Sequence, residues 1–184
     1  MKIYTKTGDS GISSVSHLRL PKTHSYFATL GSIDLLNSNI GILIYHLTNK
    51  NDLLIQSLTN IQSNLMKISS YICGYLIIDM QNQITNIEQE IDELEKTNIE
   101  LKNFILPQGN LLSLEAHNIR SLARFVERDI VNLSTNEDFL KIIGDKKIIM
   151  IDSVMPYINR LSDYFFVLAR YLNNNGKDDI IWKV

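Results

Sequence analysis

Apolar residues along most of this chain recur every three or four positions, which is the spacing of amphipathic helices. The clearest case runs from Leu111 to Leu133, where Leu122, Ala123 and Val126 belong to one predicted buried face. The same periodicity predicts a helix with an acidic outer face around 84–94. Apolar content, the spacing of apolar residues and the residues that interrupt helices predict further helices at about 25–47, 52–75 and 153–172. The last has Pro156 in its first turn, where proline is tolerated.

The remaining segments lack this periodicity. Residues 1–24 are predicted to form an ordered, non-helical arm, and 104–109 to form a loop whose aromatic Phe104 is interpreted as a hydrophobic plug over the bundle end. Residues 79–85 interrupt the helical pattern, and 176–184 form a short tail. For 132–152 the pattern predicts no particular structure.

Composition supports a single helical domain. The chain has 184 residues, with only three prolines and eight glycines, too few for a many-stranded sandwich or barrel. Its net charge of -2 gives no indication of nucleic acid or an anionic membrane as partner. The apolar run 40–47 is far shorter than a membrane span, and the N-terminus has no apolar signal core. Because Cys73 is the single cysteine, the chain cannot form an internal disulfide. Taken together, these features lead us to expect a cytoplasmic protein.

A charged row lies opposite the buried face of the 111–133 helix. Arg120, Arg124 and Glu127 are spaced by four and then three residues, with Arg128 at the edge. Guanidinium groups offer rigid forks of donors that grip anions. A solvated stripe held by i,i+4 pairs explains the same spacing, so both interpretations stay open here.

The arm carries a composition suited to phosphate. Within ten residues, 5–14, it gathers hydroxyl groups, Lys6, and the glycines Gly8 and Gly11, with Arg19 and Lys22 following. Glycines let backbone N–H groups turn toward a phosphate. The G-x-x-x-x-G-K-[ST] spacing is absent, and a plain polar turn remains the alternative.

Two other helices carry polar groups that need partners. Asp34, Asn37 and Gly41 share one face, and a buried Asp34 would require a cation, for which Arg120 is the candidate. Residues 159–163 place Asn, Arg, Ser and Asp inside an otherwise apolar helix, which indicates a pocket or an inter-helix network.

Five segments, in fixed order over almost the whole chain, resemble the PduO-type ATP:cob(I)alamin adenosyltransferases, also called corrinoid adenosyltransferases. They are Tyr4 to Gly11, Asp34 with Asn37 and Gly41, Phe104 to Gly109, His117 to Arg128, and Asn159 to Arg170.

The resemblance implies an all-α, five-helix bundle with an N-terminal nucleotide-binding arm. The chain would be one domain, with the arm at 1–24, the bundle at 25–175 and the tail at 176–184. It would form a homotrimer with sites between subunits, and would transfer the 5'-deoxyadenosyl group of Mg-ATP to cob(I)alamin, releasing triphosphate. Its expected partners are a corrinoid reductase and an adenosylcobalamin-dependent enzyme.

The resemblance also implies residue roles. Phe104 would bind cobalamin and displace its lower axial base, Asp34 would pair with Arg120 across subunits, and Glu127 would help order the nucleotide and its metal, Mg being carried mainly by ATP. The residues implied in ATP binding are Thr5, Lys6, Thr7, Gly8, Arg19, Lys22, Arg124, Glu127 and Asn159.

The chain departs from the family pattern at three places. The segment Ser16-His17-Leu18 is one residue shorter and lacks the usual Gly-Gly, Leu35 stands where the family prefers Glu, and Phe125 replaces the second of two adjacent arginines. These changes leave open a trimeric cobalamin/ATP-binding chaperone or sensor without turnover. A purely structural bundle would bind no ATP.

Overall fold

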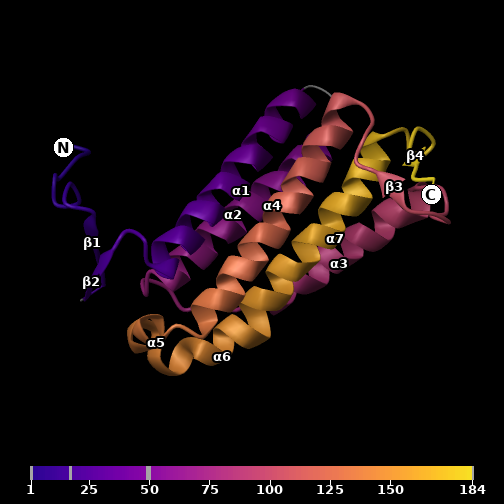
Figure 1. Cartoon of the computed structure of the whole chain (residues 1–184). Coiled ribbons are helices and arrows are strands. Elements are labelled where there is room, and N and C mark those ends of the chain that lie inside the picture. Colours follow the sequence, from indigo (N-terminus) through magenta and orange to yellow (C-terminus); the bar gives the residue numbers. More distant parts are fainter. Residues whose placement is uncertain (1, 17, 49–50, 184) are drawn as a thin grey trace.

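Five long helices form the body of the molecule in the computed structural model, which describes residues 2–16, 18–48 and 51–183 (Figure 1). They are α1 (Ser25–Leu47), α2 (Asp52–Ile72), α3 (Gln81–Thr97), α4 (Leu111–Ser134) and α7 (Met155–Leu172). Helix α4 packs against α1 and α7, α3 packs against α7, and α1 packs against α2. The predicted all-α fold class is confirmed.

The centre of the bundle is apolar and closely packed. Helix α4 contributes Ala116, Ile119, Ala123 and Val126, all buried, and the two alanines let neighbouring helices approach its backbone. Its N-terminus is capped by Asn110, whose side chain accepts a hydrogen bond from the Ser113 N–H at 3.1 Å. The cap and the small buried residues explain why α4 begins and packs where it does.

Helix α2 ends at Ile72, three residues before the predicted end. Gly74 has a φ of 82°, a left-handed conformation that glycine adopts without strain, and the Tyr75 N–H bonds back to the Ser70 carbonyl. Apolar residues continue after it, but Tyr75 and Ile77 are exposed. The interruption therefore comes earlier than predicted, and α3 already begins at Gln81.

The segment without a predicted structure, 132–152, is mostly helical. It contains the end of α4, then α5 (Glu137–Ile143), a 3-10 turn (Gly144–Lys146) and α6 (Lys147–Ile149). A π-helical segment, Met150–Val154, leads into α7, with the Met155 N–H bonded to the Met150 carbonyl. Pro156 lies in the first turn of α7 as predicted.

Short strands flank the bundle at both ends of the chain. The arm forms a hairpin of β1 (Ile12–Val15) and β2 (Leu18–Pro21), with Val15 paired to Leu18. Strand β3 (Ile105–Leu106) pairs antiparallel with β4 (Ile180–Ile181). Figure 1 places these two pairs far apart, the hairpin beyond the N-terminal end of α1 and the β3–β4 pair beside the opposite end of the bundle.

Helix α1 keeps much of its apolar surface exposed. Leu35, Ile42 and Tyr45 are each at least half exposed. By length and composition α1 could cross a membrane, a test that the core helix of a globular protein also passes. The sequence prediction considered only its apolar run 40–47.

Candidate active site

Glu127 on α4 and Asn159 on α7 meet between their helices. The Asn159 Nδ2 donates to Glu127 Oε1 at 2.7 Å, and both side chains are half-buried. Arg124, one turn before Glu127, is exposed. The structure therefore joins Glu127 to Asn159 and leaves the neighbouring guanidinium of Arg124 facing solvent.

Arg120 is not simply a member of a solvated stripe. Its guanidinium lies over the Phe166 ring, 5.9 Å from the centroid, and its Nε is buried without a hydrogen-bond partner. Burial lowers the pKa of Arg120 from its ordinary value, and the nearby charge of Arg124 lowers it further. Among the described residues no ion pair joins Arg120 to Asp34, which is exposed on α1.

His117 lies one turn before Arg120 and is buried. Neither ring nitrogen has a hydrogen-bond partner, and the ring is 6.3 Å from that of Phe166. Burial, followed by the charge of Arg120, lowers the pKa of His117, which favours the neutral imidazole. The sequence motif included this histidine, although no role was predicted for it.

The arm gathers most of its predicted phosphate-binding groups into one loop. The Thr5 and Thr7 hydroxyl groups are 2.9 Å apart, and Arg19 Nη2 donates to the Thr7 carbonyl at 3.1 Å. A Cβ at Gly8 would lie 3.1 Å from Lys22 Nζ, so glycine leaves room for this ammonium group. Lys6 has a φ of 60° and its Nζ lies over the Tyr4 ring.

The arm and the α4–α7 cluster remain separate within one chain. No hydrogen bond or ion pair connects Lys6, Arg19 or Lys22 with Arg124, Glu127 or Asn159 in the described structure. Figure 1 shows the arm projecting beyond the end of α1 rather than folding back along α4. The predicted ATP-binding residues therefore form two groups.

Phe104 lies outside the bundle, so its interpretation as a hydrophobic plug is wrong. Its side chain is 80% exposed and meets the edge of Trp182, with ring centroids 6.3 Å apart. The backbone N–H of Trp182 donates to the backbone carbonyl of Phe104 at 2.8 Å, and this bond extends the β3–β4 pairing. Leu101, Lys102, Asn103 and the two aromatic rings line a hollow of about 410 Å³.

A buried ion pair holds this tail against α7. Arg170 Nε donates to Asp179 Oδ2 at 2.7 Å, and both side chains are only 7% exposed. Arg170 Nη2 also donates to the Ile99 carbonyl, and Asn173 Nδ2 donates to Asp179 Oδ1. Sequence reasoning missed this closure; its signal was the run Asn174-Asn175-Gly176, residue types that tolerate the positive φ that all three adopt in the structure.

A dedicated metal centre is not evident. The described residues contain no group of three or more His, Cys, Asp or Glu side chains that could hold a metal ion. The carboxylate of Glu127 is still suited to contribute one ligand to a metal carried by phosphate oxygens.

Comparison with known proteins decides the family of the chain. The family model described as cobalamin adenosyltransferase matches residues 3–172. The chain belongs to this family. Corrinoid adenosyltransferase from Bacillus subtilis (strain 168) is 33% identical, with 98% of this chain and 91% of that protein aligned. Human corrinoid adenosyltransferase MMAB is also 33% identical, over 92% of this chain and 68% of that protein.

Solved structures agree with the adenosyltransferase assignment. A variant of the PduO-type ATP:corrinoid adenosyltransferase from Lactobacillus reuteri, complexed with cobalamin and ATP, superposes with a TM-score of 0.84 at 28% identity, covering all of both chains. Another variant of that protein, complexed with ATP, gives the same TM-score at 29% identity and covers 98% of this chain. The predicted family and enzyme class are confirmed.

The departures from the adenosyltransferase pattern leave the Glu127–Asn159 pair unchanged. Ser16 follows β1 and is exposed, Leu18 begins β2 and is partly buried against the core, and His17 lies outside the described residues. Leu35 is half exposed on α1. Phe125 is also exposed and lies under the Arg128 guanidinium, 5.5 Å from its carbon to the ring centroid. None of these changes disrupts the Glu127–Asn159 pair.

Proposed function

We propose that this chain transfers the 5'-deoxyadenosyl group of ATP to the cobalt of cob(I)alamin, releasing triphosphate, at sites between subunits of a homotrimer. The observation that carries the proposal is the separation of two assembled groups. The arm and the Arg124–Glu127–Asn159 cluster each have suitable chemistry, but they do not meet within one chain. A neighbouring subunit would bring them together.

Arg120 and Asp34 support the same assembly. A buried guanidinium nitrogen without a partner is unusual, because buried polar groups in folded proteins are almost always hydrogen-bonded. Asp34 of a neighbouring subunit would satisfy it. The exposed apolar side chains of α1, including Leu35, Ile42 and Tyr45, would be covered in the same contact.

The reaction asks the protein for positioning and charge stabilisation. Cob(I)alamin supplies the electron pair that forms the Co–C bond to C5', and the breaking C5'–O bond leaves its electron pair on triphosphate. The arm residues Thr5, Lys6, Thr7, Gly8, Arg19 and Lys22 would hold that leaving group. Arg124 and Asn159 would contact the nucleotide, and Glu127 would order it with Mg²⁺, which the phosphates mainly carry.

Phe104 would act on the corrin. An exposed ring beside Trp182 can occupy the lower face of the corrin and exclude the lower axial base, which makes Co(II) easier to reduce.

The proposed enzyme is a single domain, with the arm at 1–24, the bundle at 25–175 and the tail at 176–184. The enzyme would be cytoplasmic, with a reductase supplying cob(I)alamin and an adenosylcobalamin-dependent enzyme using the product.

The test is anaerobic incubation of the purified chain with Mg-ATP and chemically reduced cobalamin, followed by absorbance spectra and triphosphate release. We expect adenosylcobalamin and triphosphate in equal amounts, and neither product without ATP. A chaperone or sensor would bind both ligands without forming the Co–C bond. A purely structural bundle would not bind ATP. Either result would overturn the proposal.

A further inference from the structure

Contacts on two sides hold the side-chain amide of Asn159 in one orientation. Glu127 accepts a hydrogen bond from its Nδ2 at 2.7 Å, while Arg160 Nη1 donates to its Oδ1 at 2.9 Å. An ionised carboxylate only accepts hydrogen bonds, and a guanidinium only donates them. If the amide turned over, oxygen would face the Glu127 carboxylate and nitrogen would face the guanidinium.

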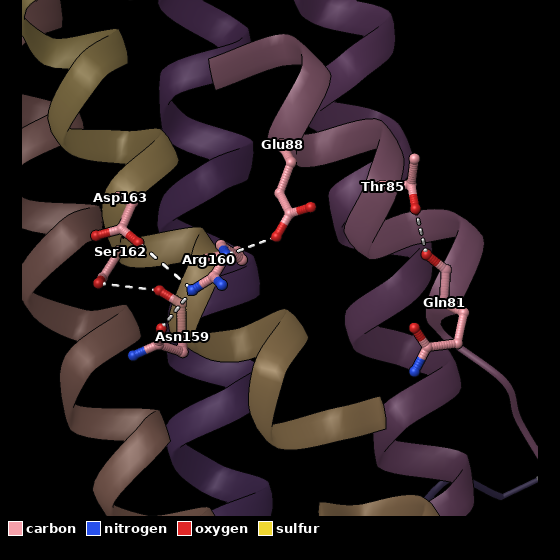
Figure 2. Close-up of polar contacts among 7 residues, drawn as sticks. All are labelled: Gln81, Thr85, Glu88, Asn159, Arg160, Ser162 and Asp163. Atoms are coloured by element: carbon pink, nitrogen blue, oxygen red, sulfur yellow. Dashed lines mark hydrogen bonds and ion pairs between the residues drawn. The ribbon is translucent and has the colours of Figure 1, made fainter. Parts of the chain in front are cut away.

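Arg160 is itself held by the neighbouring helix. Its Nε donates to Glu88 Oε1 on α3 at 2.8 Å, and its Nη1 lies 4.0 Å from Asp163 Oδ2 (Figure 2). The planar guanidinium can serve Glu88 and Asn159 simultaneously from different nitrogens. A continuous chain of three hydrogen bonds thus runs from α3 through α7 to Glu127 on α4.

The Arg160–Glu88 pair contributes more to geometry than to stability. The two side chains are 39% and 46% exposed, and ion pairs this accessible to water are weakly stabilising. Other contacts also join α3 to α7, including one at the C-cap of α3, where Asn98 Nδ2 donates to the Val167 carbonyl at 3.1 Å. Losing the Arg160 contact would therefore leave the helices packed but release the amide.

We propose that Arg160 and Glu88 are positioning residues for the ATP site. Glu88 orients the Arg160 guanidinium, Arg160 fixes the Asn159 amide, and that amide holds Glu127 Oε1. This inference rests on the proposed function, because Asn159 and Glu127 matter to ATP only if ATP binds beside them. It adds α3 to the elements that determine the site.

Arg160→Lys is the discriminating variant. Lysine keeps a positive charge for Glu88 but has one nitrogen, which cannot reproduce the fork to both Glu88 and Asn159. We expect the melting temperature to change little and kcat/KM for ATP to fall about tenfold, the scale of effect known for removing a group that orients a metal ligand. Calorimetric titration with Mg-ATP measures nucleotide affinity without depending on cobalamin.

Asn98→Ala is the matched control, because it removes another contact between α3 and α7 that does not reach Asn159. It should lower the melting temperature and leave kcat/KM for ATP unchanged. Glu88→Ala provides a second test that keeps Arg160; it should reduce kcat/KM for ATP several-fold with the trimer intact, and it replaces Arg160→Lys if that variant does not fold.

The outcomes separate the two proposals. A wild-type protein that forms no product would refute the proposed function itself. An active wild type with unchanged ATP kinetics in Arg160→Lys or Glu88→Ala would overturn the positioning role alone. Equal loss of ATP affinity in Asn98→Ala would also overturn it, because the contact would then act only through general helix packing.

Discussion

Replacing Asp179 by alanine should leave the buried Arg170 guanidinium at the end of α7 without its carboxylate partner. The substitution removes both carboxylate oxygens, one bonded to Arg170 and the other to Asn173. Since both members of the ion pair are only 7% exposed, water cannot readily replace the lost acceptor. Breaking such a buried pair costs about 3–5 kcal/mol of unfolding free energy.

This cost is large enough to measure by thermal unfolding. In a chain of this length each kcal/mol lowers the melting temperature by about 2–4 °C, so Asp179→Ala should lower it by roughly 6–20 °C. Far-ultraviolet circular dichroism would follow the transition at equal protein concentrations, because subunit assembly also contributes to stability. The neighbouring Asp178 is exposed and provides a matched control in Asp178→Ala.

The two variants also test whether the tail supports Phe104. Asp179→Ala should loosen the segment that leads to β4 and Trp182, and with it the strand that carries Phe104. Asp178→Ala should leave both the melting temperature and activity near wild type. A loss below about 1 kcal/mol in Asp179→Ala, or equal losses in the two variants, would refute the reasoning from burial.

Four further predictions concern assembly, ATP, the corrin and pH. Light scattering should give three times the subunit mass of 21.1 kDa; Asp34→Ala should weaken this assembly, and a wild-type monomer at micromolar concentration would exclude the shared site. Arg124→Ala should raise the KM for ATP, because losing a charge-assisted contact costs about 1.5–3 kcal/mol of binding free energy. Unchanged kinetics would mean that Arg124 is only part of a solvated charged stripe. Phe104→Ala should lose most turnover from Co(II) but recover with pre-reduced cob(I)alamin; equal deficits in the two assays would contradict its axial role. Burial raises the pKa of Tyr71 to about 12 from 10.0, so the unfolded chain loses the Tyr71 proton at a lower pH than the folded chain does. The stability that the neutral Tyr71 contributes should be complete below pH 10 and lost between pH 10 and 12, which unfolding curves at alkaline pH would measure.

The long helices were predictable because each buries one apolar face. The predicted bounds of α1 agree with the structure, and those of α4 differ by one residue at its end. The end of α2 was missed because exposed Tyr75 and Ile77 continue its apolar composition past Gly74. Periodicity alone does not distinguish an apolar residue inside a helix from one in the following loop.

The candidate site was predictable where its residues share a helix or a short loop. The row from Arg120 to Glu127 and the loop around Gly8 are local in sequence, so spacing and composition indicate them. Contacts between distant segments were not predictable in this way. Arg170 with Asp179, and Phe104 with Trp182, meet only because the chain reverses after α7 and pairs β4 with β3.

The π-helical segment before α7 has a consequence for single-residue insertions and deletions. Its wider turn, closed by the bond from the Met155 N–H to the Met150 carbonyl, accommodates one residue more than a regular α-helical turn. Losing one codon there would restore a regular turn and keep the phase of α7. Losing one codon between Pro156 and Ile158 would rotate Asn159 by about 100°, away from Glu127. The π-helical segment is thus a place before the site where the helix can lose one residue without turning Asn159 away from Glu127.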